Sequence, residues 1–313
     1  MTYRILSIDG GGVRGLIPGV VLCEIEKRMG KPLSDCFDLI AGTSAGGQIA
    51  LAMSRAAKDG SAFWSADGID ELYARSFATI FPFKKTGKLD LLRGVTHEKY
   101  SADGFESVLA ELFGDSLMSE SRVEVLIPAY EVEKGVPHFF TRSAAIEDPH
   151  ENHSMRFVAR STSSAPTFFE PNQHHAGERA YIDGAVFANN PAMCAFAHAQ
   201  SLGFDEDDMT VVSLGTGSIS KDLTYDDTKD WGLVKWARPL FDITSQASNL
   251  SIDWQLSHIL RKAHYFRITP VFKDGRSAID DARPENMAAV REIGLKMIEE
   301  NSAVIDQLCE RIS

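Results

Sequence analysis

One serine in this sequence stands between two glycines, where an apolar strand is expected to give way to a helix. Leu39-Ile40-Ala41 is a short apolar run, which is typical of a buried strand, and the residues from Gln48 to Met53 are good helix formers. The segment Gly42-Thr43-Ser44-Ala45-Gly46 is therefore predicted to be a strand-to-helix turn. Glycines on both sides permit a tight bend that exposes the serine hydroxyl above a helix N-terminus. Ser44 is thus a candidate nucleophile, although the pattern also describes a glycine-rich turn with a capping serine.

A second glycine-rich segment, Asp9-Gly10-Gly11-Gly12-Val13-Arg14-Gly15, lies between a predicted strand from Tyr3 to Ile8 and a predicted amphipathic helix from Pro18 to Met29. Three consecutive glycines let a backbone turn its N–H groups to one side and approach an anionic oxygen closely. We therefore expect this loop to form an oxyanion hole, whose donors stabilise the negative charge that develops when Ser44 attacks a carbonyl group.

The same loop fits the dinucleotide pattern Gly10-x-Gly12-x-x-Gly15, so a non-catalytic nucleotide or anion binding module is the competing interpretation. A dinucleotide fold requires an acidic residue at the end of the second strand, about 20 residues after the loop. Here the second strand ends in Ala41-Gly42-Thr43-Ser44. The acid is missing, which disfavours the nucleotide interpretation.

A catalytic serine needs a group that removes its proton, and histidine is the usual one. His258 and His264 come late enough in the chain to be considered, but neither sits on an obvious loop after a predicted strand. Asp183 ends a predicted strand and precedes Gly184, where an aspartate is usually only a turn former. We nevertheless predict a dyad of Ser44 and Asp183, in which the carboxylate accepts the serine proton and returns it to the leaving alcohol.

The strands and helices expected around these residues are those of an α/β fold with a central sheet. Ligands of such sheets gather beyond the C-terminal ends of the strands, where the glycine-rich turns recur. Several helical patches within residues 58–122 predict a helical insertion that lies over the edge of the sheet. Residues 231–261 hold three of the four tryptophans and predict one or two helices, either as ordinary amphipathic packing or as a lipid contact or gate. The last predicted helix covers residues 285–312, with a break near Asn301.

The length of 313 residues favours one domain over residues 1–313, with a motif-bearing core at about 3–220, a helical insertion at about 58–122 and a C-terminal helical region at about 221–313. The net charge of -12 disfavours nucleic acid polymers as partners. Four scattered cysteines without metal-type spacing predict reduced thiols and a cytoplasmic location. No apolar run approaches the roughly 20 residues of a membrane span, so contact with lipid is expected to be peripheral. A homo-oligomer is compatible with these features.

In combination, these motifs resemble those of the patatin-like phospholipase family. The resemblance covers about the first 220 residues and also includes Thr162 to Phe169, Ala188-Asn189-Asn190-Pro191 and Ser213-Leu214-Gly215-Thr216-Gly217. It implies a three-layer α/β/α fold with a mostly parallel central sheet and a Ser–Asp catalytic dyad. It also implies a lipid acyl hydrolase that needs no metal and no other cofactor.

Carried over by motif, the resemblance makes Ser44 the nucleophile and Asp183 the base. It assigns the oxyanion hole to Gly10, Gly11, Gly12 and Arg14, with supporting motif positions at Gly15, Gly42, Gly46 and Gly184. Asp183 is followed by Gly-Ala where plant patatins have Gly-Gly, a variation that the wider family allows. The expected reaction is phospholipase A-type cleavage of the fatty acyl esters of membrane phospholipids through a Ser44 acyl-enzyme.

The region from Trp231 to Gln255 also resembles bacterial patatin-like proteins, some of which are phospholipase effectors switched on by a cyclic dinucleotide in antiviral defence. That subgroup implies a cyclic dinucleotide activator. The sequence contains no readable motif for such a ligand, and a chain of net charge -12 would need a local basic pocket to hold it.

Overall fold

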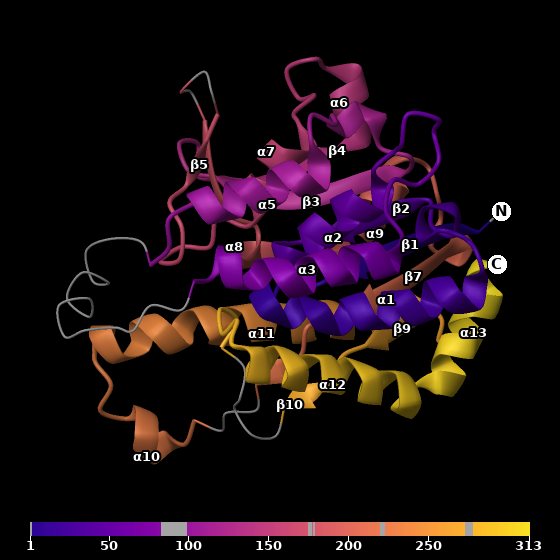
Figure 1. The fold of residues 1–313 in the computed structure, drawn as a ribbon. Coiled ribbons are helices and arrows are strands. Elements are labelled where there is room, and N and C mark those ends of the chain that lie inside the picture. The colour runs from indigo at the N-terminus through magenta and orange to yellow at the C-terminus, as the bar shows by residue number, and fades with distance from the viewer. Residues whose placement is uncertain (1, 83–98, 175–176, 178, 220–222, 273–277) are drawn as a thin grey trace.

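The centre of the computed structural model, which describes residues 2–82, 99–174, 177, 179–219, 223–272 and 278–313, is an eight-stranded, mostly parallel sheet (Figure 1). Its strands lie in the order β5 (Asn172–Gln173), β6 (Ala180–Asp183), β3 (Glu124–Glu131), β2 (Leu39–Gly42), β1 (Tyr3–Ile8), β7 (Met209–Leu214) and β9 (Tyr265–Ile268), with β4 (Val136–Thr141) paired to β3. The five strands from β3 to β9 run parallel, whereas β4 and β6 pair antiparallel with β3, and β5 with β6. β8 (Ser218–Ile219) and β10 (Val271–Phe272) form a separate parallel pair.

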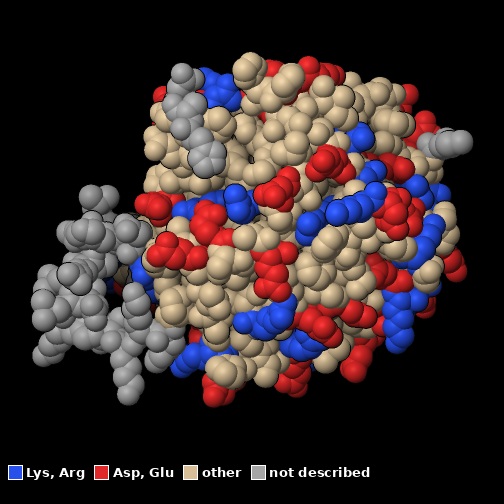
Figure 2. Space-filling view, turned by 45° about the horizontal axis from the view of Figure 1, so that its top comes forward, with Lys and Arg blue, Asp and Glu red and all other residues tan. Residues whose placement is uncertain are grey.

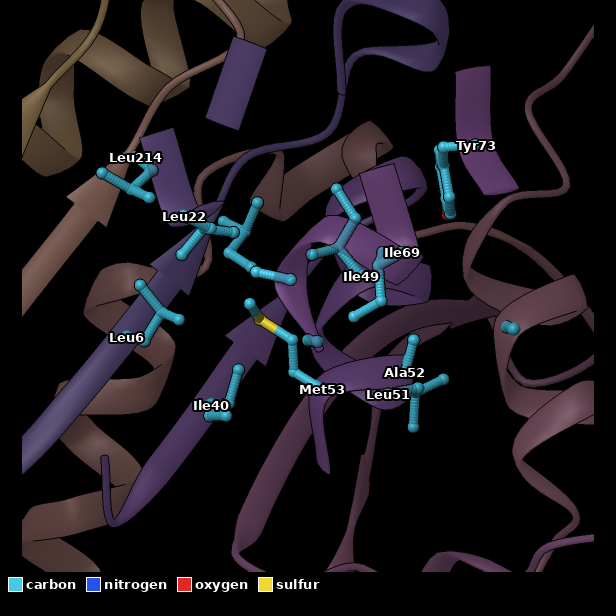
Figure 3. Close-up of a cluster of buried hydrophobic side chains, with 14 of the residues drawn as sticks. Leu6, Leu22, Ile40, Ile49, Leu51, Ala52, Met53, Ile69, Tyr73 and Leu214 are labelled. Atoms are coloured by element: carbon cyan, nitrogen blue, oxygen red, sulfur yellow. The ribbon is translucent and has the colours of Figure 1, made fainter. Parts of the chain in front are cut away.

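Helices cover both faces of this sheet, because successive residues of a strand point to opposite sides. In β1, Leu6 and Ile8 belong to one hydrophobic core and Ile5 to the other. The first core is covered by α1 (Leu16–Met29), α2 (Ala45–Ser54), α3 (Ala66–Ile80), α5 (Asp103–Phe113), α7 (Met155–Thr162), α12 (Pro284–Glu300) and α13 (Ser302–Ile312). Figure 3 shows part of it, with strand residues Leu6, Ile40 and Leu214 facing side chains of α1, α2 and α3. The second core is covered by α9 (Ala192–Ser201) and α11 (Leu233–Ile259). The three-layer α/β/α fold with a mostly parallel sheet is therefore confirmed.

The remaining helices are short. They are α6 (Arg142–Glu147), α8 (Ala185–Ala188) and α10 (Tyr225–Thr228), with 3-10 turns at Gly12–Gly15, Leu33–Asp35, Met118–Glu120 and Glu206–Asp208. Two expectations about helices are confirmed: residues 231–261 contain one long helix, α11, and the closing helix is interrupted at Asn301, between α12 and α13. Residues 83–98 of the predicted insertion, 220–222 at the predicted start of the C-terminal region and 273–277 within that region lie outside the described residues.

The order of the strands reverses at β1, which pairs with β2 on one side and with β7 on the other. Loops that leave the C-terminal ends of β1, β2 and β7 therefore diverge, and such a switch point is where α/β sheets bind ligands. β6 reaches the same level from the opposite direction: Ala41 pairs with Leu126 of β3, and Asp183 pairs with Ala129 farther along that strand. The sheet thus brings the ends of β2 and β6 together.

Acidic and basic side chains are interspersed on the face of the molecule drawn in Figure 2. On this face, the acidic residues therefore do not form one continuous negative patch. Among the described helices, none is long and apolar enough to cross a membrane.

Candidate active site

Ser44 occupies a sharp turn between β2 and α2. Its φ angle of 56° lies in a region of backbone conformation that residues other than glycine rarely adopt. The glycines on either side make this turn sterically possible. A Cβ atom on Gly42 would lie 2.1 Å from the carbonyl oxygen of Gly46, and one on Gly46 would lie 2.3 Å from the carbonyl oxygen of Ile8. The predicted strand-to-helix turn is confirmed, with glycine required at both flanking positions.

The hydroxyl of Ser44 donates a hydrogen bond of 2.6 Å to Oδ2 of Asp183. The other carboxylate oxygen, Oδ1, accepts the N–H of Ala185 at 2.8 Å. Asp183 is 1% exposed, and burial raises the pKa of this carboxyl to about 7, against the smaller opposing effects of the two hydrogen bonds. A carboxylate with a pKa near neutrality in contact with a serine hydroxyl is suited to accept its proton.

Threonine hydroxyls hold the turn at Ser44 against neighbouring elements. The N–H of Ser44 donates to Oγ1 of Thr162 at 3.1 Å, and that hydroxyl donates to the carbonyl of Pro128 at 2.6 Å. The hydroxyl of Thr43 donates to the carbonyl of Ala188 at 2.6 Å. These bonds tie the turn to α7, β3 and α8, so the orientation of Ser44 is fixed by several separate segments.

The glycine loop after β1 lies beside Ser44, since a Cβ on Gly10 would lie 3.3 Å from Cβ of Ser44. Its N–H groups are not equivalent: Gly10 donates to the carbonyl of Asn189 at 3.0 Å, and Arg14 donates to the carbonyl of Gly11 at 3.1 Å. Within the described part of the chain, the N–H groups of Gly11 and Gly12 make no hydrogen bond. Of the four predicted oxyanion-hole residues, only these two therefore have backbone donors free for a ligand.

Three of the predicted supporting glycines, Gly15, Gly42 and Gly46, lie where the loop, β2 and α2 meet. A Cβ on Gly15 would lie 3.2 Å from Cβ of Ala45. Gly184 packs on β3, because its Cβ would lie 2.3 Å from the carbonyl oxygen of Pro128. The guanidinium of Arg14 donates to the carbonyl of Gly217 at 3.3 Å and so links the loop to the segment after β7.

A cavity with about 990 Å³ of empty space, partly open to solvent, connects these groups. Ser44, Asp183 and the first three glycines of the loop line one part of it. Elsewhere its wall includes a set of large apolar side chains: Phe77, Ile80, Phe81, Phe105, Phe168 and Phe169. Phe168 and Phe169 belong to a motif noted in the sequence, whereas the contributions of α3 and α5 were not predicted. The adjacent aromatic residues Phe168 and Phe169 were the one sequence signal for an apolar pocket. Nothing in the local sequence indicated which helices would face Ser44.

A second buried carboxylate, Asp9, anchors the start of the glycine loop. Arg267 at the end of β9 forms a bidentate ion pair with it, with nitrogen–oxygen distances of 2.9 and 2.6 Å, and also donates to Oγ of Ser213 at 2.8 Å. Asp9 is 1% exposed. No motif in the sequence marks Arg267, which is separated from the loop by most of the chain.

The two histidines considered as alternative bases lie elsewhere. His258 is exposed on α11, where its Nδ1 contacts the carbonyl of Trp254 at 2.7 Å. His264 contacts the carbonyl of Met209, at the start of β7 and so at the edge of the sheet opposite to Gly215. In the described part of the chain, no group of three or more His, Cys, Asp or Glu side chains is arranged to hold a metal ion.

Comparison with known proteins agrees with the motifs in this site. The family model "Patatin-like phospholipase" matches residues 6–196. Patatin-like protein 1 of Arabidopsis thaliana is 31% identical over 94% of this chain and 81% of its own length, and Patatin-like protein 1 of Oryza sativa subsp. indica is 31% identical over 94% and 80%. Among solved structures, VipD from Legionella pneumophila aligns with a TM-score of 0.42 at 11% identity, over 96% of this chain and 67% of that chain. The matched residues include both Ser44 and Asp183.

Proposed function

Because this chain belongs to the patatin-like phospholipase family, we propose that it is a phospholipase A-type hydrolase that cleaves the fatty acyl esters of membrane phospholipids with Ser44 and Asp183. Membership of the family makes the chain an enzyme, a lipid acyl hydrolase, rather than a nucleotide-binding module. The observation that carries the finer proposal is the 2.6 Å hydrogen bond from the Ser44 hydroxyl to a buried carboxylate.

In the first half of the reaction, Asp183 accepts the proton of Ser44 while Oγ forms a bond to the ester carbonyl carbon. The negative charge that develops on the carbonyl oxygen is stabilised by the N–H groups of Gly11 and Gly12. The bond to the alkoxy oxygen then breaks, and the protonated Asp183 gives its proton to the leaving lysophospholipid alcohol. The product is an ester between Ser44 and the fatty acid.

In the second half, a water molecule attacks the acyl-enzyme while Asp183 accepts its proton. The tetrahedral intermediate uses the same two backbone donors, and its collapse returns the proton to Oγ of Ser44 and releases the fatty acid. The aromatic wall formed by Phe77, Phe105 and Phe169 offers an apolar surface to the acyl chain throughout.

The direct test replaces Ser44 by alanine and measures fatty acid release from phospholipid vesicles, together with covalent labelling by a fluorophosphonate. Wild-type protein should be labelled on Ser44 and should release fatty acid, and the Ser44→Ala variant should do neither. Ser54→Ala is a matched control, since it removes another buried hydroxyl from the far end of α2. Undiminished hydrolysis by folded Ser44→Ala protein contradicts the proposal.

The membrane itself is the proposed partner of α11. Leu240, Ile243, Leu250 and Trp254 on this helix are 52, 38, 59 and 63% exposed. Their spacing of three, seven and four residues places them on one side of the helix. Gln246, which lines the cavity, lies one turn from both Ile243 and Leu250. The apolar face therefore borders the cavity in which the ester would react, and a bilayer is the source of that ester.

Cosedimentation with phosphatidylcholine vesicles tests this contact; zwitterionic lipid suits the test, because a protein of net charge -12 is repelled by anionic surfaces. We expect the double replacement Leu250→Ser/Trp254→Ser to weaken vesicle binding at least fivefold. The matched control is Leu295→Ser, which changes a 50% exposed leucine on α12. If the double variant binds vesicles like wild type but converts a dimer into a monomer in analytical ultracentrifugation, the face is a contact between copies of this chain.

Activation by a cyclic dinucleotide and action at the cytoplasmic face of a membrane remain predictions from the sequence. The first is tested by comparing fatty acid release from vesicles with and without candidate cyclic dinucleotides. Equal rates at saturating dinucleotide contradict it. The second is tested by fractionating the native host cells and probing the soluble and membrane fractions.

A further inference from the structure

The carbonyl group of Gly10 is held from behind by a buried hydroxyl. Thr216, in the segment after β7, donates a hydrogen bond of 2.5 Å from Oγ1 to the carbonyl oxygen of Gly10 and is 1% exposed. The side-chain amide of Asn189 approaches the same oxygen at 3.5 Å. Thr216 itself does not line the cavity, whereas Gly10 and Gly11 do.

The C=O of Gly10 and the N–H of Gly11 belong to one peptide unit. That unit is trans and planar, so its C=O and N–H point in opposite directions. A hydroxyl that holds the carbonyl on the side away from the cavity therefore turns the N–H of Gly11 toward the cavity. This N–H is one of the two loop donors that make no hydrogen bond in the described part of the chain.

Two further contacts restrict this part of the loop. The N–H of Gly10 donates to the carbonyl of Asn189, which fixes the preceding unit. A Cβ on Gly11 would lie 2.4 Å from Oγ1 of Thr216, so Gly11 packs directly on the threonine side chain. A loop of three glycines has wide conformational freedom, and these contacts remove it at the donor that the reaction needs.

We propose that Thr216 is a positioning residue that aims the Gly11 N–H at the oxyanion, and that its hydroxyl is required for this. The proposal rests on the proposed function, because it assigns the oxyanion to the ester that Ser44 attacks. A preorganised donor acts on the transition state more than on the bound substrate, so losing its orientation lowers kcat more than it raises KM.

The test compares Thr216→Val, which keeps the shape and removes the hydroxyl, with Thr216→Ser, which keeps the hydroxyl. On a soluble nitrophenyl ester, Thr216→Val should lower kcat by about 10 to 100-fold with KM within about threefold, and Thr216→Ser should stay within about threefold of wild type. A trifluoromethyl ketone that adds to Ser44 should lose affinity for Thr216→Val by a similar factor. Thr210→Val is the matched control, since it removes an equally buried hydroxyl at the other end of β7 and should leave kcat unchanged.

Wild-type kcat and ketone affinity in Thr216→Val, or an equal loss in Thr216→Ser, overturn the proposal. Should Thr216→Val not fold, Thr216→Cys replaces it, and equal kcat for the Cys and Ser variants then overturns the proposal. If hydrolysis survives Ser44→Ala, the proposed function fails separately. The proposal is then decided by the Gly11 amide resonance of glycine-labelled protein, which Thr216→Val should shift and Thr210→Val should not.

Discussion

Ser44 donates a 2.6 Å hydrogen bond to Asp183, a carboxyl whose pKa burial raises to about 7. As the proposed base, Asp183 must be ionised to accept the serine proton, so activity should increase as pH rises through this value. We expect kcat/KM for a soluble ester to rise about tenfold per pH unit below pH 7 and to level off above pH 8. A pH–rate profile between pH 5 and 9, with circular dichroism to check folding at each pH, measures this. A profile that is flat over this range would contradict Asp183 as the base.

Replacement of Asp183 by asparagine should abolish activity and yet stabilise the fold. The pKa of Asp183 is about 7 in the folded protein, whereas that of an ordinary aspartate is 3.8. The folded state therefore holds the proton of this carboxyl more tightly than the unfolded chain does. The stability from this group is fully present below pH 3.8 and is lost as pH rises through 7. At pH 8 the ionised carboxylate therefore costs at most about 4 kcal/mol, which the neutral amide avoids.

Urea denaturation of both proteins at pH 8 and pH 4 checks this prediction. We expect Asp183→Asn to unfold at higher urea concentration at pH 8, and the difference from wild type to shrink toward pH 4. If the Asp183→Asn variant is less stable than wild type at pH 8, the ionised carboxylate stabilises the fold, and this prediction is wrong.

The turn at Ser44 could be predicted from sequence because its causes are local. Gly42 and Gly46 stand within two residues of Ser44, and the steric need for them is written in that spacing. The position of Asp183 at a strand end was also predictable. The direction of β6 was not, because whether a strand pairs parallel or antiparallel is decided by distant parts of the chain.

The supporting residues of the site were harder to predict for the same reason. Arg267 reaches Asp9 only because β9 is added to the sheet beside β7, and Thr216 reaches Gly10 only because β7 pairs with β1. Each is an ordinary residue in its own segment. The contacts that give them a role come from the order of the strands, which the local pattern of one sequence does not contain.

The apolar wall predicts a preference for long acyl chains, which a bulkier residue at position 165 should abolish. Ala165 lines the cavity beside Phe168 and Phe169, so Ala165→Leu adds volume where the chain would lie. We expect kcat/KM for a decanoyl nitrophenyl ester to fall at least tenfold, and that for the acetyl ester to change less than threefold. The acetyl ester is the internal control for folding and for the dyad. Equal losses on both esters would place the acyl chain elsewhere.

The ion pair between Asp9 and Arg267 predicts a large and asymmetric effect on stability. Arg267→Met removes the cation and leaves a buried carboxylate uncompensated, which typically costs about 3 to 5 kcal/mol in the free energy of unfolding. The double replacement Asp9→Asn/Arg267→Met removes both charges and should recover much of that loss. Arg75→Met is the control, because Arg75 and Glu111 are both exposed and such pairs contribute less than about 1 kcal/mol.

Urea denaturation and ester hydrolysis of these variants together show what the ion pair does. Since Asp9 directly precedes Gly10, we expect Arg267→Met also to lower kcat through disorder in the glycine loop. The double variant should regain stability more fully than kcat, because an asparagine and a methionine do not reproduce the bidentate geometry that holds the loop. Full recovery of both would mean that the ion pair contributes only charge balance, and that Thr216 and Asn189 suffice to orient the loop.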